Sequence, residues 1–102
     1  MLNLTQALIN IRAGMALLDS RNPGWKFKLN LETLDFKCSK NCVLGQVYGV
    51  YTNGVGKLGL DWNDDADNIK IQALGFNVPA SYDWFSDCDI MTKLWKGMLT
   101  NT

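Results

Sequence analysis

The sequence predicts a mainly α-helical protein, a small compact irregular bundle of about four helices in a single globular domain over residues 1–102. Apolar residues recur at spacings of three and four near the beginning and near the end of the chain, which is typical of amphipathic helices. Hydrophobic residues make up 47% of the chain and charged residues 20%, enough apolar surface for a packed core. We therefore expect one core that needs neither disulfides nor a metal.

The first expected helix runs from about residue 4 to about residue 19. Asn3 is its expected N-cap, and Gln6 is placed to return a hydrogen bond to that cap. Asn22-Pro23-Gly24 ends the helix, because a residue before proline avoids the helical region. The apolar stripe comprises Leu4, Leu8, Ile11, Met15 and Leu18.

The middle of the chain is ambiguous. Residues 25–36 alternate like a strand, although Asn30 could equally cap a short turn. A second helix is expected through Cys42 to Tyr48, capped by Ser39 or Asn41, with residues 46–51 as a competing strand. A short β-hairpin of residues 26–31 and 46–51 is therefore the main alternative to an all-helical fold.

The second half predicts two further helices. Asn53-Gly54, Gly56 and Gly59 indicate a turn-rich connection, after which the Asp64 to Asp67 cluster caps a helix reaching Leu74, with Gly75 as a left-handed terminus. Ser86 and Asp89 form a capping-box-like pair before the last helix. The apolar face of that helix comprises Ile90, Met91, Leu94, Trp95, Met98 and Leu99. The expected core comprises Leu8, Ile11, Met15, Leu18, Leu31, Leu34, Val43, Leu44, Val47, Ile69, Leu74, Phe76, Leu94, Trp95 and Met98.

Charge and cysteine content restrict the function classes. Residues 1–60 carry seven Lys/Arg and three Asp/Glu, residues 61–102 carry three and seven, and the net charge is zero. The chain lacks the net positive charge with which nucleic-acid-binding proteins neutralise phosphates, so nucleic acid is not the expected partner. Three cysteines, the lack of a leader pattern and the lack of a long apolar run favour a reduced, cytoplasmic, non-membrane setting in a host cell.

Two motifs resemble known ligand-binding motifs only in part. Gly54 to Gly59 matches Gly-x-Gly-x-x-Gly, but the usual nucleotide domain does not fit around it, so we interpret it as a glycine-rich turn. Asp61 to Asp67 places oxygen ligands on alternate positions, as in a calcium loop, but Ala66 and Gln72 stand where that loop needs Gly and Glu. We therefore expect no metal and no cofactor, and interpret the acidic cluster as a solvated loop with a helix cap.

The sequence contains no histidine, which removes the commonest general base and thiol activator. We therefore expect no catalytic residue and a non-enzymatic protein. Cys38-Ser-Lys-Asn-Cys42 has the spacing of neither a redox motif nor a zinc pair. Cys42 is the candidate reactive thiol, since a helix N-terminus with Lys37 and Lys40 nearby would stabilise its thiolate; the alternative is a buried cysteine in the core.

Four aromatic residues are candidate partner-binding residues. Trp25, Trp62, Trp84 and Phe85 fall in expected loops or element ends, whereas Trp95 belongs to a core face. Aromatic side chains are enriched at interface hot spots, although in so small a domain they commonly cover the edge of the core.

Several segments together resemble a group of short proteins encoded by phages and prophages of Gram-positive bacteria, a group without a known activity. The matching segments are Leu17-Leu18-Asp19, Asn22-Pro23-Gly24-Trp25, Leu31 through Asp35, Cys42-Val43-Leu44-Gly45-Gln46 with Tyr48-Gly49, Leu74-Gly75-Phe76 and Leu94-Trp95. The resemblance implies a phage or prophage origin and carries over no site residue.

Three functional hypotheses follow. The first is a phage-derived accessory protein that binds a host protein, of the host-takeover or counter-defence type. The second is a nucleic-acid-associated regulator that uses the basic first half. The third is a thiol-dependent enzyme or redox protein built around Cys42.

Overall fold

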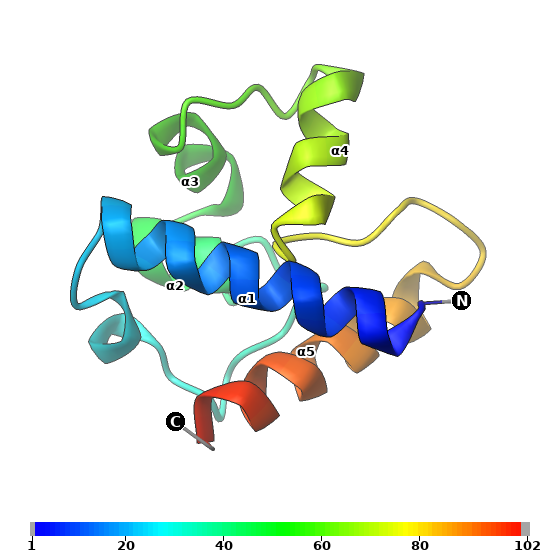
Figure 1. Ribbon diagram of the computed structural model, residues 1–102, viewed down its shortest axis with the longest axis horizontal. Helices are drawn as coiled ribbons and strands as arrows, with labels where there is room; N and C mark the ends of the chain where they lie inside the picture. Colours follow the sequence, from blue (N-terminus) through cyan, green and yellow to red (C-terminus); the bar gives the residue numbers. More distant parts are fainter. Residues whose placement is uncertain (1, 101–102) are drawn as a thin grey trace.

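The computed structural model describes residues 2–100, which contain five α-helices, one 3₁₀ helix and no strand (Figure 1). In chain order these are α1 (Leu4–Arg21), η1 (Trp25–Lys28), α2 (Val43–Tyr48), α3 (Tyr51–Lys57), α4 (Asp65–Ala73) and α5 (Trp84–Thr100). The radius of gyration of the Cα atoms is 12.3 Å, close to the value of about 13 Å typical of a compact domain of about 100 residues. The mainly helical prediction is confirmed, and the hairpin alternative is wrong.

Helix α1 begins and ends close to the predicted positions. Asn3 caps it, because its Oδ1 accepts a hydrogen bond from the backbone N–H of Gln6 at 3.0 Å. The expected capping box is not formed, since the side-chain amide of Gln6 donates to Oδ1 of Asn10 at 2.8 Å. Asn22 is the C-cap, and its backbone N–H donates to the carbonyl oxygen of Leu18.

The ambiguous segment 25–36 forms η1 and then a series of turns. Gln46 of α2 holds this segment in place. Its Oε1 accepts from the backbone N–H of Asn30 at 2.6 Å, and its Nε2 donates to the carbonyl oxygen of Asn30 at 3.1 Å. A side chain thus satisfies the backbone groups that a partner strand would satisfy in a hairpin.

Helix α3 lies where a turn-rich connection was expected. A Cβ atom on Gly54 would lie 2.8 Å from Cβ of Leu44, so glycine is what allows α3 to pack closely against α2. Val55 is completely buried and fixes the inner face of α3. The turn prediction is therefore wrong for Gly54 and Gly56, and the left-handed turn comes only at Gly59.

Helix α4 follows its prediction, whereas α5 begins earlier than expected. Oδ2 of Asp64 accepts from the backbone N–H of Asp67 at 2.9 Å, which confirms the predicted helix cap, and Gly75 is left-handed with φ 74°. Helix α5 begins at Trp84, so Ser86 lies inside its first turn and the predicted Ser86–Asp89 capping pair is wrong.

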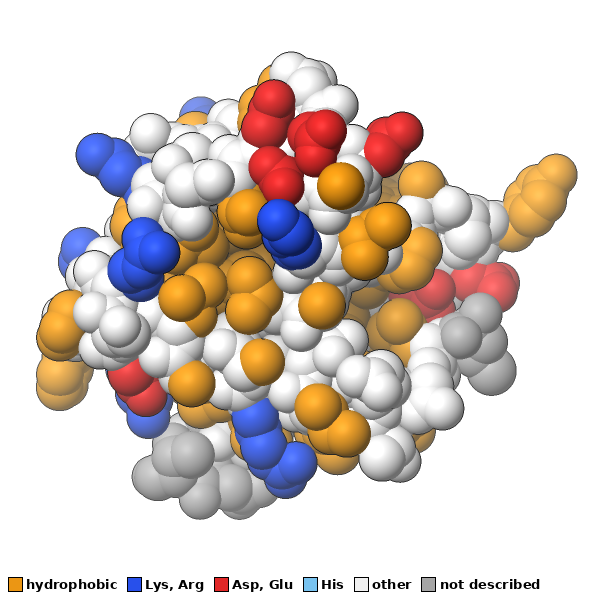
Figure 2. Space-filling view, turned by 45° about the horizontal axis from the view of Figure 1, so that its top comes forward, with side chains coloured by type: hydrophobic (Ala, Val, Ile, Leu, Met, Phe, Trp, Pro, Cys, Tyr) orange, Lys and Arg blue, Asp and Glu red, His pale blue; other side chains and the backbone are white. Residues whose placement is uncertain are grey.

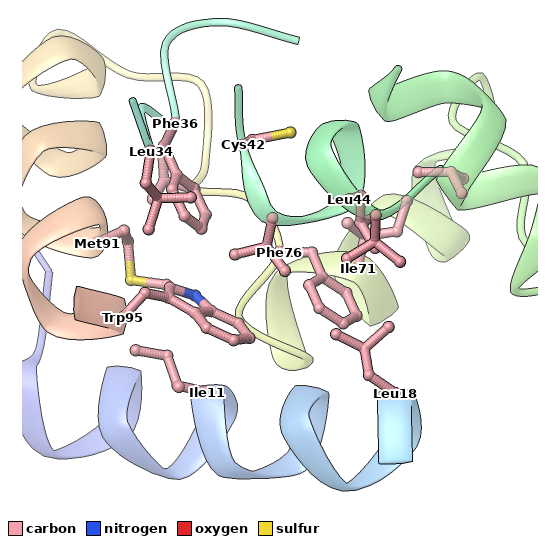
Figure 3. Close-up of a cluster of buried hydrophobic side chains, with 14 of the residues drawn as sticks. Ile11, Leu18, Leu34, Phe36, Cys42, Leu44, Ile71, Phe76, Met91 and Trp95 are labelled. Carbon is pink, nitrogen blue, oxygen red and sulfur yellow. The ribbon is translucent and has the colours of Figure 1, made fainter. Parts of the chain in front are cut away.

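The buried side chains form one core between α1, α2, α4 and α5 (Figure 3). Trp95 is completely buried, with ring centroids 6.3 Å from Trp25, 6.4 Å from Phe36 and 6.0 Å from Phe76. The buried apolar residues are Ala7, Ile11, Leu18, Trp25, Leu34, Phe36, Cys42, Val43, Leu44, Val47, Val55, Leu58, Ile71, Phe76, Val78, Cys88, Met91 and Trp95.

Some predicted core positions are only partly buried, and one is wrong. The partly buried ones are Leu8, Met15, Leu31, Leu74, Leu94 and Met98. Ile69 is 67% exposed, because α4 turns Ile71 into the core instead.

Candidate functional site

Cys42 is the N-cap of α2, in place of the predicted Ser39 or Asn41. Its Sγ accepts a hydrogen bond from the backbone N–H of Gly45 at 3.3 Å and donates a weak one to the carbonyl oxygen of Ser39 at 3.7 Å. The residue is 3% exposed, and Figure 3 shows it at the edge of the hydrophobic cluster, between Phe36 and Leu44. Cys42 therefore acts as a structural cap.

The pKa of Cys42 is raised, mainly because burial disfavours the thiolate, and the hydrogen bond from Gly45 opposes this only in part. This is the opposite of the lowered pKa that the helix N-terminus and the two lysines predicted. Lys37 is directed towards Asp89 instead, with its Nζ 2.8 Å from Oδ1 of Asp89 in an ion pair. At neutral pH the Cys42 thiol is thus protonated and poorly nucleophilic.

A cavity of about 140 Å³ nevertheless opens beside Cys42, and we call it the Cys42 cavity. Four separate parts of the chain build it: the loop before α2, the first residue of α3, the segment after α4 and the first residue of α5. Besides Cys42 and Lys37, it is lined by Phe36, Ser39, Tyr51, Phe76, Asn77 and Trp84. Half of its lining residues are therefore aromatic.

Tyr51 and Asn77 form the polar side of the Cys42 cavity. Nδ2 of Asn77 donates to the hydroxyl oxygen of Tyr51 at 3.1 Å, and Oδ1 of Asn77 accepts from the backbone N–H of Val78 at 2.8 Å. Burial raises the pKa of Tyr51, and the hydrogen bond from Asn77 opposes this only in part. The cavity therefore presents protonated, neutral hydroxyl and thiol groups that can form hydrogen bonds.

The structure separates the aromatic residues that the sequence grouped as partner anchors. Trp25 is 1% exposed and its Nε1–H donates to Oδ1 of Asp19 at 2.8 Å, so it belongs to the core and offers no surface to a partner. Trp84 is partly buried and lines the Cys42 cavity. The ring centroids of Trp84 and Phe85 lie 5.0 Å apart, and Phe85 is 67% exposed. Trp62 is 48% exposed before α4, and no ring contact within residues 2–100 joins it to Trp84 or Phe85.

A second concave feature has apolar walls and was not predicted. Its volume is about 350 Å³, and we call it the apolar groove. It is lined by Leu17 of α1, Leu58 and Leu60 after α3, and Lys70, Ala73 and Leu74 at the end of α4. Figure 2 shows a hollow with orange side chains near the middle of this face, bordered by blue basic side chains, with red acidic ones gathered above.

The periodicity of the sequence does not predict the apolar groove. Leu17 lies beside the main stripe of α1, and Leu58 and Leu60 follow a helix that was expected to be a loop. The only sequence signal is the pair of leucines that flanks Gly59, which is unusual for a turn that faces solvent.

Comparison with known proteins adds no relative: no family model matches the chain, and no curated protein or solved structure matches it. Within residues 2–100, no group of three or more Cys, Asp or Glu side chains is arranged to hold a metal ion. None of the helices in that range has the length and apolar character needed to cross a membrane.

Proposed function

We propose that this protein acts by binding a segment of another protein in the apolar groove, as a small accessory protein of phage or prophage origin that engages a host protein. The observation that carries the proposal is the groove itself, where the partly exposed Leu17, Leu60 and Leu74, from α1, the segment after α3 and the end of α4, meet around the buried Leu58. Apolar surface gathered in a concavity marks interaction sites more often than scattered surface leucines do. The phage origin is supported by the sequence resemblance alone.

The charges around the apolar groove favour a partner segment that carries Asp or Glu. Lys70 lines the groove, Lys57 directly precedes Leu58, and Arg21 lies one turn beyond Leu17 on the same face of α1. Neither Lys57 nor Arg21 forms an ion pair with a described residue. We therefore expect apolar side chains of the partner to fill the groove while its carboxylates meet these three cations.

The acidic cluster before and within α4 offsets this preference only in part, because the carboxylates of Asp61, Asp64 and Asp67 accept hydrogen bonds within the protein. Asp64 caps α4, Oδ2 of Asp67 accepts from the backbone N–H of Asp61 at 2.9 Å, and Oδ1 of Asp67 lies 3.6 Å from Nζ of Lys70. The last contact is solvent-exposed and contributes little, so Lys70 remains able to meet a partner.

Peptides selected on the purified protein from a random display library test the occupant directly. We expect the enriched peptides to combine apolar residues with Asp or Glu. The double variant Lys57→Glu/Lys70→Glu should bind them about tenfold more weakly, whereas Lys93→Glu/Lys96→Glu on α5 should bind them unchanged apart from a small long-range effect. Basic peptides, or equal losses in both double variants, would contradict the proposed partner chemistry.

Photo-crosslinking locates the binding surface in cells that carry the natural partner. A benzoylphenylalanine at Leu60 should form one dominant adduct that a selected peptide displaces, and the same group at Phe27, which is 95% exposed on η1, should not form it. A crosslinked dimer of this chain would show that the groove binds a second copy of the chain and not a different protein. Salt-sensitive retention on DNA or RNA with no peptide binding would favour a nucleic-acid regulator.

A further inference from the structure

We propose that the Cys42 cavity binds a small, neutral, planar molecule: a single aromatic or heteroaromatic ring that carries one carbonyl oxygen. The site is separate from the apolar groove, since the two are lined by different residues, so either can exist without the other.

The size and walls of the Cys42 cavity select a single ring. Its volume of about 140 Å³ is close to that of an engineered protein cavity of about 150 Å³ that accepts benzene. Phe36, Tyr51, Phe76 and Trp84 supply aromatic faces and edges, and aromatic rings favour stacked or edge-to-face contacts with one another. A flat ring fills such a space better than a branched aliphatic group.

The unused hydrogen-bond donors in the Cys42 cavity favour a ligand that carries a carbonyl oxygen. The hydroxyl oxygen of Tyr51 is used as an acceptor for Asn77, but its own proton has no acceptor among the described residues. Asn77 has its amide orientation fixed by the bond from Val78 to Oδ1, and only one of its two N–H groups is used. Two unused donors thus lie on atoms that are 3.1 Å apart, so a single acceptor oxygen can be reached by both.

The charge around the Cys42 cavity selects a neutral ligand. Lys37 is the cation that lines it, and Asp89 neutralises this lysine at 2.8 Å. Cys42 and Tyr51 are protonated at neutral pH, so neither attracts a cation. A carboxylate would have to give up its hydration without a free positive charge, which a neutral carbonyl does not.

Benzamide is the probe for this site, titrated into ¹⁵N-labelled full-length protein and followed by NMR. We expect saturable shifts at the indole N–H of Trp84 and the backbone amides of Cys42 and Tyr51, with ethylbenzene, which lacks the carbonyl, binding at least fivefold more weakly. Tyr51→Phe should weaken benzamide binding about fivefold, as loss of one hydrogen bond predicts. Tyr48→Phe is the matched control and should leave the affinity unchanged.

Two further measurements keep the proposal testable if Tyr51→Phe fails to fold. Asn77→Asp keeps the acceptor for Val78 but removes the amide donors, so it should also weaken benzamide binding. Saturating benzamide should slow alkylation of Cys42 by iodoacetamide and leave Cys38, which is partly exposed, unaffected. Shifts that do not saturate, equal binding of ethylbenzene, or equal losses in Tyr51→Phe and Tyr48→Phe would overturn the proposal.

Discussion

The indole N–H of Trp95 donates a hydrogen bond to the carbonyl oxygen of Gly75 at 2.7 Å, in the completely buried centre of the protein. Gly75 ends the last turn of α4 with a left-handed φ of 74° and lies directly against Ile11 of α1. Gly75 therefore joins the end of α4 to α5 through this hydrogen bond and to α1 through the close approach of Ile11 (Figure 1).

Trp95→Phe should lower the free energy of unfolding by about 2–4 kcal/mol, because it leaves a cavity and an unpaired buried carbonyl oxygen at Gly75. Urea denaturation followed by circular dichroism measures the change. Trp62→Phe is the control, since this ring is 48% exposed, and it should change stability by less than about 0.5 kcal/mol. Equal losses in the two variants would show that the Trp95–Gly75 contact is not a main support of the core.

Gly75→Ala and Gly56→Ala should change stability in opposite directions. A Cβ on Gly75 would lie 2.9 Å from the backbone of Ile11, and the left-handed backbone adds strain, so we expect a loss of about 2 kcal/mol or more. A Cβ on Gly56 meets nothing within 4 Å inside α3, so alanine should stabilise the protein by about 0.5–1 kcal/mol. Thermal denaturation of the two variants side by side tests both. A stable Gly75→Ala protein would contradict the close approach of α1.

Helices α1 and α4 were predictable from sequence because their signals are local. The cap at Asn3, the stop at Asn22-Pro23, the cap at Asp64 and the terminus at Gly75 each depend on residues within one turn. Helix α3 escaped prediction because Gly54 serves a contact with α2, and that contact is visible only once the two helices are packed.

The candidate sites were harder to predict than the helices. For Cys42 the sequence offered a reactive thiol and a buried cysteine, and the structure confirms the buried cysteine, because segments distant in the sequence cover it and raise its pKa. The sequence places Trp25 in an expected loop or element end, whereas in the structure its ring packs against Trp95, seventy residues away. The apolar groove and the Cys42 cavity each combine residues from several elements, and no local pattern marks such a combination.

Alkaline pH should destabilise the protein partly through Cys88, a completely buried thiol. Burial raises its pKa from 9.0 to about 11, with the carboxylate of Asp35 adding to the effect. Between these two values the unfolded chain releases a proton that the folded protein keeps, so this contribution to stability is present in full below pH 9 and is lost as the pH rises towards 11. We expect a loss of about 2 kcal/mol between pH 8 and pH 10.5.

The contribution of Cys88 is isolated by comparison with Cys88→Ala, since lysines and tyrosines titrate in the same range. Urea denaturation of both proteins at pH 8 and pH 10.5 gives two differences in the free energy of unfolding. The wild type should lose about 2 kcal/mol more than the variant over this interval. The same pH dependence in both proteins would contradict the assignment to Cys88.

Thr92 connects α5 to the segment that carries Phe36, and its hydroxyl does so through two hydrogen bonds. Oγ1 accepts from the backbone N–H of Phe36 at 3.0 Å and donates to the carbonyl oxygen of Cys88 at 2.8 Å. Thr92→Val preserves the shape of the side chain but leaves the buried N–H of Phe36 without an acceptor, which should cost about 1–3 kcal/mol. Thr92→Ser keeps the hydroxyl and loses only a methyl group, so it should cost less, about 1 kcal/mol.

Amide hydrogen exchange at Phe36 separates the two effects: after correction for global stability, Thr92→Val should expose this amide selectively, whereas Thr92→Ser should leave its relative protection unchanged. Selective loss of protection in both variants, or in neither, would mean that packing rather than the Thr92 hydroxyl holds the Phe36 segment against α5 and so shapes that wall of the Cys42 cavity.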